Sequence, residues 1–190
     1  MSPFWLPIVI VGGSCLLALF VLARYNALVK SRNRVHEAWS GIDVQLCQRA
    51  SLIPHVVAAV RGYAAHERKV FEQVARASGA LQQASGAANA GAANDMVTSA
   101  LGRVLAVAEN YPQLRASENF MTLRHDLRDI EEKIAFARQF YNRNVLDYNT
   151  RIETYPDAFF AHAFNFMPAD LFEASDAARV DVRVSFPPAA

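Results

Sequence analysis

An uncharged apolar run near the N-terminus constrains this chain more than any other feature. Residues 4–23 read FWLPIVIVGGSCLLALFVLA, twenty residues without a charged side chain. As a helix this run is roughly 30 Å long, which matches the hydrocarbon core of a bilayer. We interpret residues 1–23 as a retained transmembrane anchor in contact with membrane lipid. The alternative is a signal peptide cleaved after Ala23, but no Lys or Arg precedes the run, which also exceeds the roughly 7–15 residues of a typical signal-peptide core.

Charge near the apolar run predicts an orientation. Four basic residues follow the run at positions 24, 30, 32 and 34, and none precedes it. The positive-inside rule then places the N-terminus outside and the rest of a single-pass protein in the cytoplasm. The alternative is that these bases lie on an ordinary solvated helix face. The whole chain has 19 basic and 18 acidic residues, so it lacks the basic excess typical of proteins that bind nucleic acid.

The region after the anchor has helical periodicity in its first half. Apolar residues recur at spacings of three and four from about Arg24 to Ala50, and again from Ile53 to Val74. Between them, Ser51 is suited to cap a helix and Pro54 to its first turn. A tight hairpin at this point and one continuous helix kinked at Pro54 are both compatible with the sequence.

A segment of small residues follows. Residues 78–94 read SGALQQASGAANAGAAN, and their three glycines weaken any helix. We therefore expect a flexible loop here, with Asn94 or Asp95 capping a short third helix. That helix should end before Pro112.

The longest periodic segment begins at Phe120 and continues to Ile152. Its apolar residues keep a heptad-like spacing over more than four heptads. So long a one-sided helix needs partner helices to be stable. We predict an all-α protein in which residues 24–166 form an antiparallel up-and-down four-helix bundle with coiled-coil-like packing. The fourth helix then returns toward the membrane.

The C-terminal tail, residues 167–190, departs from the helical pattern. Residues 179–186 read RVDVRVSF and alternate strictly, which is typical of a half-buried strand. A lone strand leaves backbone groups without partners. It could lie on its own bundle, or pair with the same strand of other subunits in a homo-oligomer. The residues that would form the apolar face are Val180, Val182, Val184 and Phe186.

Polar residues interrupt the apolar face of the first helix. Arg49 falls between Leu46 and Ile53 on this face, and Gln45 lies one turn earlier. Asp43 flanks the face beside Trp39 and Leu46. The start of the fourth helix should lie opposite and carries several acids. We predict a structural polar seam in which Arg49 pairs with Asp126 or Glu131, because a buried pair of this kind fixes register.

The dipeptide Tyr-Asn occurs three times. Its copies are Tyr25-Asn26, Tyr141-Asn142 and Tyr148-Asn149, and the last two are one heptad apart. A returning fourth helix should bring the last copy near the first, at the membrane end of the bundle. Hydrogen-bonded positions inside the bundle and a partner-binding surface both fit this pattern.

An aromatic run follows the fourth helix. Residues 154–172 read TYPDAFFAHAFNFMPADLF. The run could cap the membrane-proximal end of the bundle, or it could enter the lipid headgroup region as an interfacial segment.

The sequence shows no pattern typical of an enzyme. His66-Glu67 lacks the second histidine of a metallopeptidase helix, since Val70 stands in its place. The glycines of residues 79–91 lack the lysine of a phosphate loop. We therefore expect no catalytic residue, no cofactor and no metal.

Several ordered matches make the chain similar to the LemA family across nearly its whole length. They are RYNALVKSRNRVHEAW after the anchor, IDVQL with Arg49, LIP with GYAAHE, YPQLRASENF, YNRNVLDYN and FEA at 172–174. This resemblance implies an anchored antiparallel four-helix bundle in a bacterial inner membrane. Relatives are associated with magnetosome membranes, and family genes tend to lie near those of membrane metallopeptidases.

Two functional hypotheses follow. In the first, the chain is a non-enzymatic scaffold that self-assembles and organises or shapes a bacterial membrane. In the second, it is an adaptor for a membrane protease or another envelope quality-control machine. A large homo-oligomer would favour the first hypothesis, and co-purification of a second protein would favour the other.

Overall fold

Every regular element in the described part of the chain is a helix. The computed structural model describes residues 5–172. Its helices are α1 (Trp5–Arg61), α2 (Arg68–Gln83), α3 (Ala87–Ala108), α4 (Pro112–Arg115), α5 (Glu118–Glu153) and α6 (Asp157–Ala163). The predicted all-α class is confirmed. The arrangement of four helices as one antiparallel bundle stays a prediction, and the predicted strand over 179–186 lies outside the described residues.

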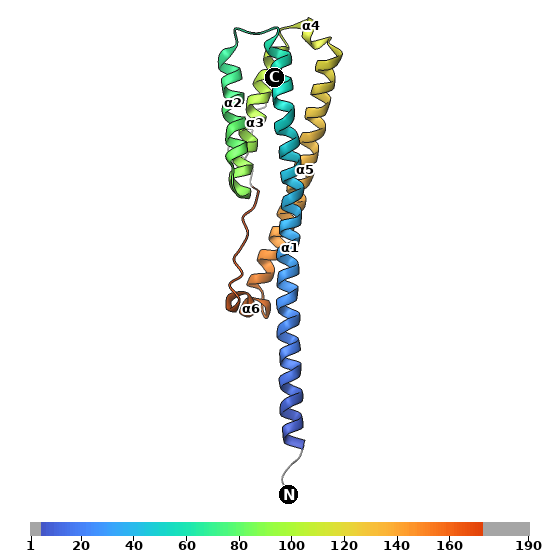
Figure 1. Cartoon of the computed structure of the whole chain (residues 1–190), viewed down its shortest axis with the longest axis vertical. Coiled ribbons are helices and arrows are strands. Elements are labelled where there is room, and N and C mark those ends of the chain that lie inside the picture. Colours follow the sequence, from blue (N-terminus) through green and yellow to red (C-terminus); the bar gives the residue numbers. More distant parts are fainter. Residues whose placement is uncertain (1–4, 173–190) are drawn as a thin grey trace, which may run out of the picture. The chain divides into compact units, whose positions relative to one another are not determined.

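The long helix α1 joins two segments that the sequence allowed to be separate. It continues without a break through Pro54 to Arg61 (Figure 1), so the continuous alternative is correct and the hairpin is wrong. Ser51 is not a helix cap, because it lies inside α1 and its hydroxyl donates to the carbonyl of Gln48 at 2.7 Å. Pro54 lies on the exposed face while Ile53 and Val56 are buried, so packing offsets the backbone hydrogen bond that proline removes.

The expected flexible loop over residues 78–94 is wrong. Both α2 and α3 extend into this segment, leaving only Ala84–Gly86 between them. Alanine is the strongest helix former and offsets the cost of the glycines. The break falls at Gly86, whose φ of +80° favours glycine. The third helix therefore begins at Ala87, not at a cap on Asn94 or Asp95.

The helices fall into two compact units, each with its own apolar core. The first comprises residues up to 45 together with 131–171, and the second comprises residues 46–130 with Phe172. In the first unit, α1 and α5 contribute buried residues at helical spacing, including Leu28, Val35 and Ile42 from α1 and Ile134, Val145 and Ile152 from α5. This confirms the periodic faces that the sequence indicated for these two helices.

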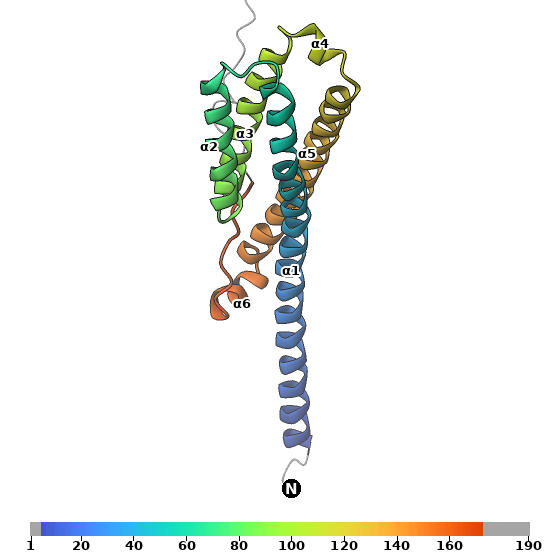
Figure 2. The same ribbon diagram turned by 45° about the horizontal axis from the view of Figure 1, so that its top comes forward.

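In the second unit, α2 and α3 form an antiparallel hairpin. They lie side by side in both views (Figures 1 and 2). Their buried residues are mostly small, such as Ala77 of α2 and Ala90, Ala93 and Ala100 of α3. Small side chains let two helix backbones approach closely, which is why the alanine-rich segment packs as helix instead of remaining a loop.

Candidate functional site

The N-terminal part of α1 exposes its apolar side chains. Between residues 9 and 22 every large apolar residue except the half-buried Val21 is 42% to 70% exposed. This helix is the candidate membrane span among the described residues, and none of its most apolar window is buried inside the protein. In water so large an apolar surface is unfavourable, whereas in a lipid bilayer it is not.

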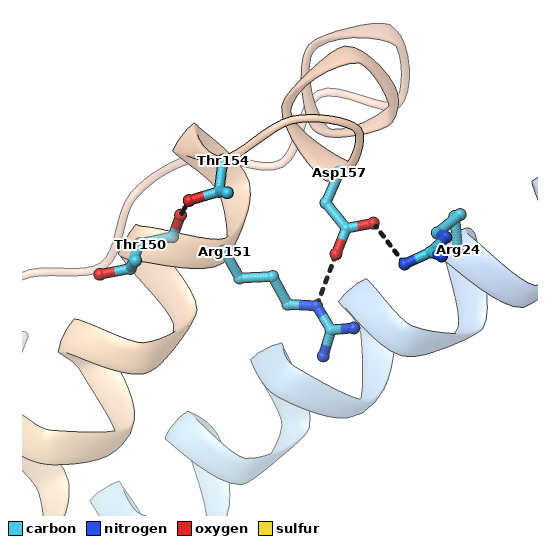
Figure 3. Close-up of polar contacts among 5 residues, drawn as sticks. All are labelled: Arg24, Thr150, Arg151, Thr154 and Asp157. Atoms are coloured by element: carbon cyan, nitrogen blue, oxygen red, sulfur yellow. Dashed lines mark hydrogen bonds and ion pairs between the residues drawn. The ribbon is translucent and has the colours of Figure 1, made fainter.

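Just after this apolar part, α6 is attached to α1 by charged groups. Asp157, the first residue of α6, lies between two arginines (Figure 3). Its Oδ2 accepts a hydrogen bond from Arg151 Nε at 2.8 Å, and its Oδ1 is 3.6 Å from Arg24 Nη1. The Asp157 side chain is only 10% exposed, so the two guanidinium groups neutralise a carboxylate that is largely removed from water.

Aromatic rings strengthen the same attachment. Phe160 of α6 packs edge-on against Phe20 at 6.0 Å between ring centroids, and Phe164 packs against Tyr25 at 5.1 Å. The guanidinium of Arg24 lies over the Phe20 ring at 5.0 Å. Edge-on ring pairs and cation–π contacts each contribute a modest stabilisation beyond that of the apolar area they bury.

Three side chains of α5 hold the chain that follows α6. The Tyr148 hydroxyl donates to the carbonyl of Met167, and the Tyr141 hydroxyl donates to the carbonyl of Asp170, both at 2.8 Å. Asn149 makes two bonds with Ala169: its Nδ2 donates to the carbonyl, and its Oδ1 accepts from the backbone N–H, both at 2.9 Å. These bonds satisfy backbone groups of a segment that has no secondary structure of its own.

Burial raises the pKa of both tyrosines above the usual 10.0. For Tyr141 the nearby charge of Asp170 raises the pKa further. For Tyr148 the charge of Arg32 acts in the opposite direction but is the smaller effect. Both hydroxyls therefore stay protonated and able to donate throughout the physiological range.

The other Tyr-Asn positions have different surroundings. Tyr25 contacts Phe164 and also Phe166, whose ring centroid is 5.9 Å away. Asn26 is exposed and Asn142 is half-buried. Tyr25 and Tyr148 thus contact the same stretch of chain, at residues 164–167. Tyr141, Tyr148 and Asn149 make the hydrogen bonds that one of the two interpretations expects, and the choice between bundle positions and a partner-binding surface stays a prediction.

The predicted polar seam has a partner that sequence reasoning missed. Arg49 is 2% exposed, and its guanidinium donates to Asn94 Oδ1 and, at 2.9 Å, to Thr98 Oγ1. Both partners belong to α3, in the alanine-rich segment that we expected to be a loop. An arginine and an asparagine placed 45 residues apart carry no sequence signal of pairing, so only the packing of α3 could reveal it.

The remaining seam residues are spread over both units. Asp43 is exposed, while Gln45 is half-buried with its Oε1 lacking a hydrogen-bond partner among the described residues. Asp126 is half-buried beside His125, and Glu131 is half-buried. Pairing of Arg49 with one of these two acids stays a prediction.

One open groove lies between α2 and α3. Its volume is about 430 Å³, and its polar lining includes Arg76, Asp95 and Arg103. Arg103 donates to Gln73 at 2.7 Å across the groove. Within residues 5–172 no three His, Cys, Asp or Glu side chains gather closely enough to hold a metal ion.

These features define a class: an all-helical protein with a helix long and apolar enough to cross a membrane. The chain belongs to the LemA family, whose model matches residues 38–186. It is similar to the magnetosome protein MamQ of Magnetospirillum gryphiswaldense, with 24% identity covering 83% of this chain and 67% of the relative. It is also similar to protein LemA of Metamycoplasma hominis, with 22% identity covering 86% of this chain and 75% of the relative.

Proposed function

We propose that this chain is a non-enzymatic scaffold, anchored in a bacterial inner membrane, that self-assembles and organises or shapes that membrane. The observation that carries the proposal is the apolar part of α1. Most of its large apolar side chains are exposed, yet the same helix continues into two buried cores. A cleaved signal peptide would not be expected to form one helix with the body, nor to place Phe20 against Phe160.

The similarity to a magnetosome protein agrees with a role at a membrane. The polar groups near α6 and along α5 are engaged with backbone carbonyls and with each other. Such bonds fix the positions of chain segments, which is what a structural protein requires. We keep the interpretation that the chain has no catalytic activity as part of the proposal.

Mass measurement tests self-assembly. The full-length protein, extracted gently with detergent, would be compared with a version lacking residues 176–190. We expect a large particle of defined mass that dissociates when the tail is removed, because the alternating segment 179–186 could pair between subunits. If full-length protein runs as a monomer, the scaffold is wrong. A large particle whose mass is unaffected by the truncation would support the scaffold hypothesis and show that the tail is not required for assembly.

One observation favours the second candidate, an adaptor for a membrane protease or envelope machine. Phe136 and Phe140 of α5 are 73% and 53% exposed and lie one helical turn apart. Neighbouring exposed aromatic residues are typical of protein-binding surfaces. The test is the double variant Phe136→Ser, Phe140→Ser. If it no longer co-purifies with a second protein but keeps the same particle mass, the adaptor hypothesis is favoured over the scaffold.

A further inference from the structure

The contacts of α6 fix its level along α1. Phe160 packs against Phe20, and Asp157 pairs with Arg24, so α6 lies beside the last turn of the apolar run. If residues 4–23 span the hydrocarbon core, Ala23 marks its boundary, and Phe20 lies roughly 4–5 Å inside it at 1.5 Å per residue. Phe160 must then lie at the same depth, because it touches Phe20.

Apolar side chains of this region also point away from the protein. We define residues 155–167 as the aromatic segment. Tyr155, Phe159 and Met167 are 83%, 67% and 70% exposed, and Phe164 is 46% exposed. Phe160 and Phe166 of the same segment are buried. The segment therefore has one face packed on the protein and an outer face made largely of apolar groups.

The charges of the aromatic segment do not oppose contact with lipid. Its only acidic residue is Asp157, which two arginines neutralise. Arg24 and Arg32 each lie over an aromatic ring, of Phe20 and Phe166 respectively. Arg24 directly follows the apolar run, so it can keep its charged group at the interface while its stem and the Phe20 ring lie deeper, and it attracts anionic headgroups. Arg32 lies roughly 12 Å farther along α1 at 1.5 Å per residue, where it packs on the buried Phe166.

We propose that the outer face of the aromatic segment inserts into the boundary between headgroups and acyl chains of the membrane that α1 crosses. This inference rests on the proposed anchor, since it takes the depth of α6 from α1. Interfacial segments bury their apolar face roughly 5–10 Å into this boundary, which accommodates a phenylalanine and a tyrosine. The protein then has a second membrane contact that fixes the tilt and rotation of α1.

Depth measurement with a fluorescent probe tests the inference. The full-length protein, with Cys15→Ala and Cys47→Ser, would receive one cysteine in place of Phe159, labelled with an environment-sensitive fluorophore. Vesicles of phosphatidylcholine and phosphatidylglycerol would contain lipid brominated near the headgroup end of one acyl chain. The matched control is Phe136→Cys, because Phe136 is exposed to a similar degree, 73% against 67%, but belongs to the middle of α5. A third probe at Leu17 reports on the anchor.

We expect bromine to quench the probes at positions 159 and 17 and to leave the probe at 136 unchanged. Quenching at 17 without quenching at 159 would overturn the inference and keep the anchor. Loss of quenching at both positions would overturn the anchor and the inference together. Equal quenching at 136 and 159 would mean that the whole surface contacts lipid, which also overturns a specific interfacial segment. Circular dichroism would confirm that each labelled variant keeps its helix content.

Discussion

Arg49 is the one buried charged residue among residues 46–130, the described helical part of the second unit. It is 2% exposed and bonds to the side chains of Asn94 and Thr98. A buried charge is tolerated only when its donors find acceptors, so the three residues depend on one another. This dependence gives a direct test of the packing of α1 against α3.

We expect Arg49→Ala to lower the free energy of unfolding by about 3 kcal/mol, because it leaves a buried amide without its charged partner. For a chain of this size that loss lowers Tm by roughly 6–12 °C. Thermal unfolding of the detergent-solubilised protein, followed by circular dichroism, would measure it. The matched control is Arg103→Ala, whose bond to Gln73 is exposed and should contribute about 1 kcal/mol or less. Equal shifts for the two variants would contradict this account.

Tyr141 and Tyr148 predict a dependence of stability on alkaline pH. Their folded pKa values are raised above 10.0 by burial, so the stabilisation is complete below pH 10 and is lost as pH rises through the folded pKa values. The unfolded tyrosines release their protons first, which favours unfolding. We expect Tm to fall as pH rises above 10, where the unfolded tyrosines begin to lose their protons, and we expect the Tm of the double variant Tyr141→Phe, Tyr148→Phe to fall less steeply.

The same double variant should be less stable near pH 7. Each lost hydroxyl removes a bond to a backbone carbonyl worth about 1 kcal/mol. The measurement is Tm as a function of pH for both proteins. Parallel curves over the alkaline range would show that other groups cause the alkaline loss.

Two glycines illustrate what decides the ends of the elements. Gly86 separates α2 from α3 with a positive φ, whereas Gly79 lies within α2 with open space around it. A side chain at position 86 would therefore strain the backbone, whereas position 79 can accept one without strain or clash. The helix α1 continues through the exposed Pro54 because burial of the nearby Ile53 and Val56 offsets the backbone hydrogen bond that proline removes.

We expect Gly86→Ala to destabilise the protein by about 1–2 kcal/mol, since alanine is strained at this φ. By contrast, Gly79→Ala should stabilise it by about 0.5–1 kcal/mol through higher helix propensity. Thermal unfolding of both variants provides the measurement, and each serves as the control for the other. Shifts of the same sign would mean that the connection between α2 and α3 is elsewhere.

At the scale of the whole molecule, α1 joins the candidate membrane span to two helical cores. Its apolar part is exposed, its middle part belongs to the first unit and its end belongs to the second. Basic residues follow the apolar part within a few turns. The orientation of the chain across the membrane therefore determines in which compartment both units lie.

We expect both units to lie in the cytoplasm. Cys47 is exposed, so with Cys15→Ala it is a native reporter for a maleimide that cannot cross membranes. Labelling should be weak in intact spheroplasts and strong in inverted vesicles. A protein with Ser2→Cys and both native cysteines replaced should show the reverse. Strong labelling of Cys47 in intact spheroplasts would place the units outside.

The sequence by itself determined the helical class, the apolar stretch of α1 and the buried faces of α1 and α5. These depend on local periodicity and length, which a sequence displays directly. The extent of α2 and α3 and the course of α1 through Pro54 were decided by tertiary structure. There, propensity is nearly balanced and packing over long sequence separations determines the outcome. The same holds for the partners of Arg49 and Asp157, because side chains distant in sequence meet only when helices pack.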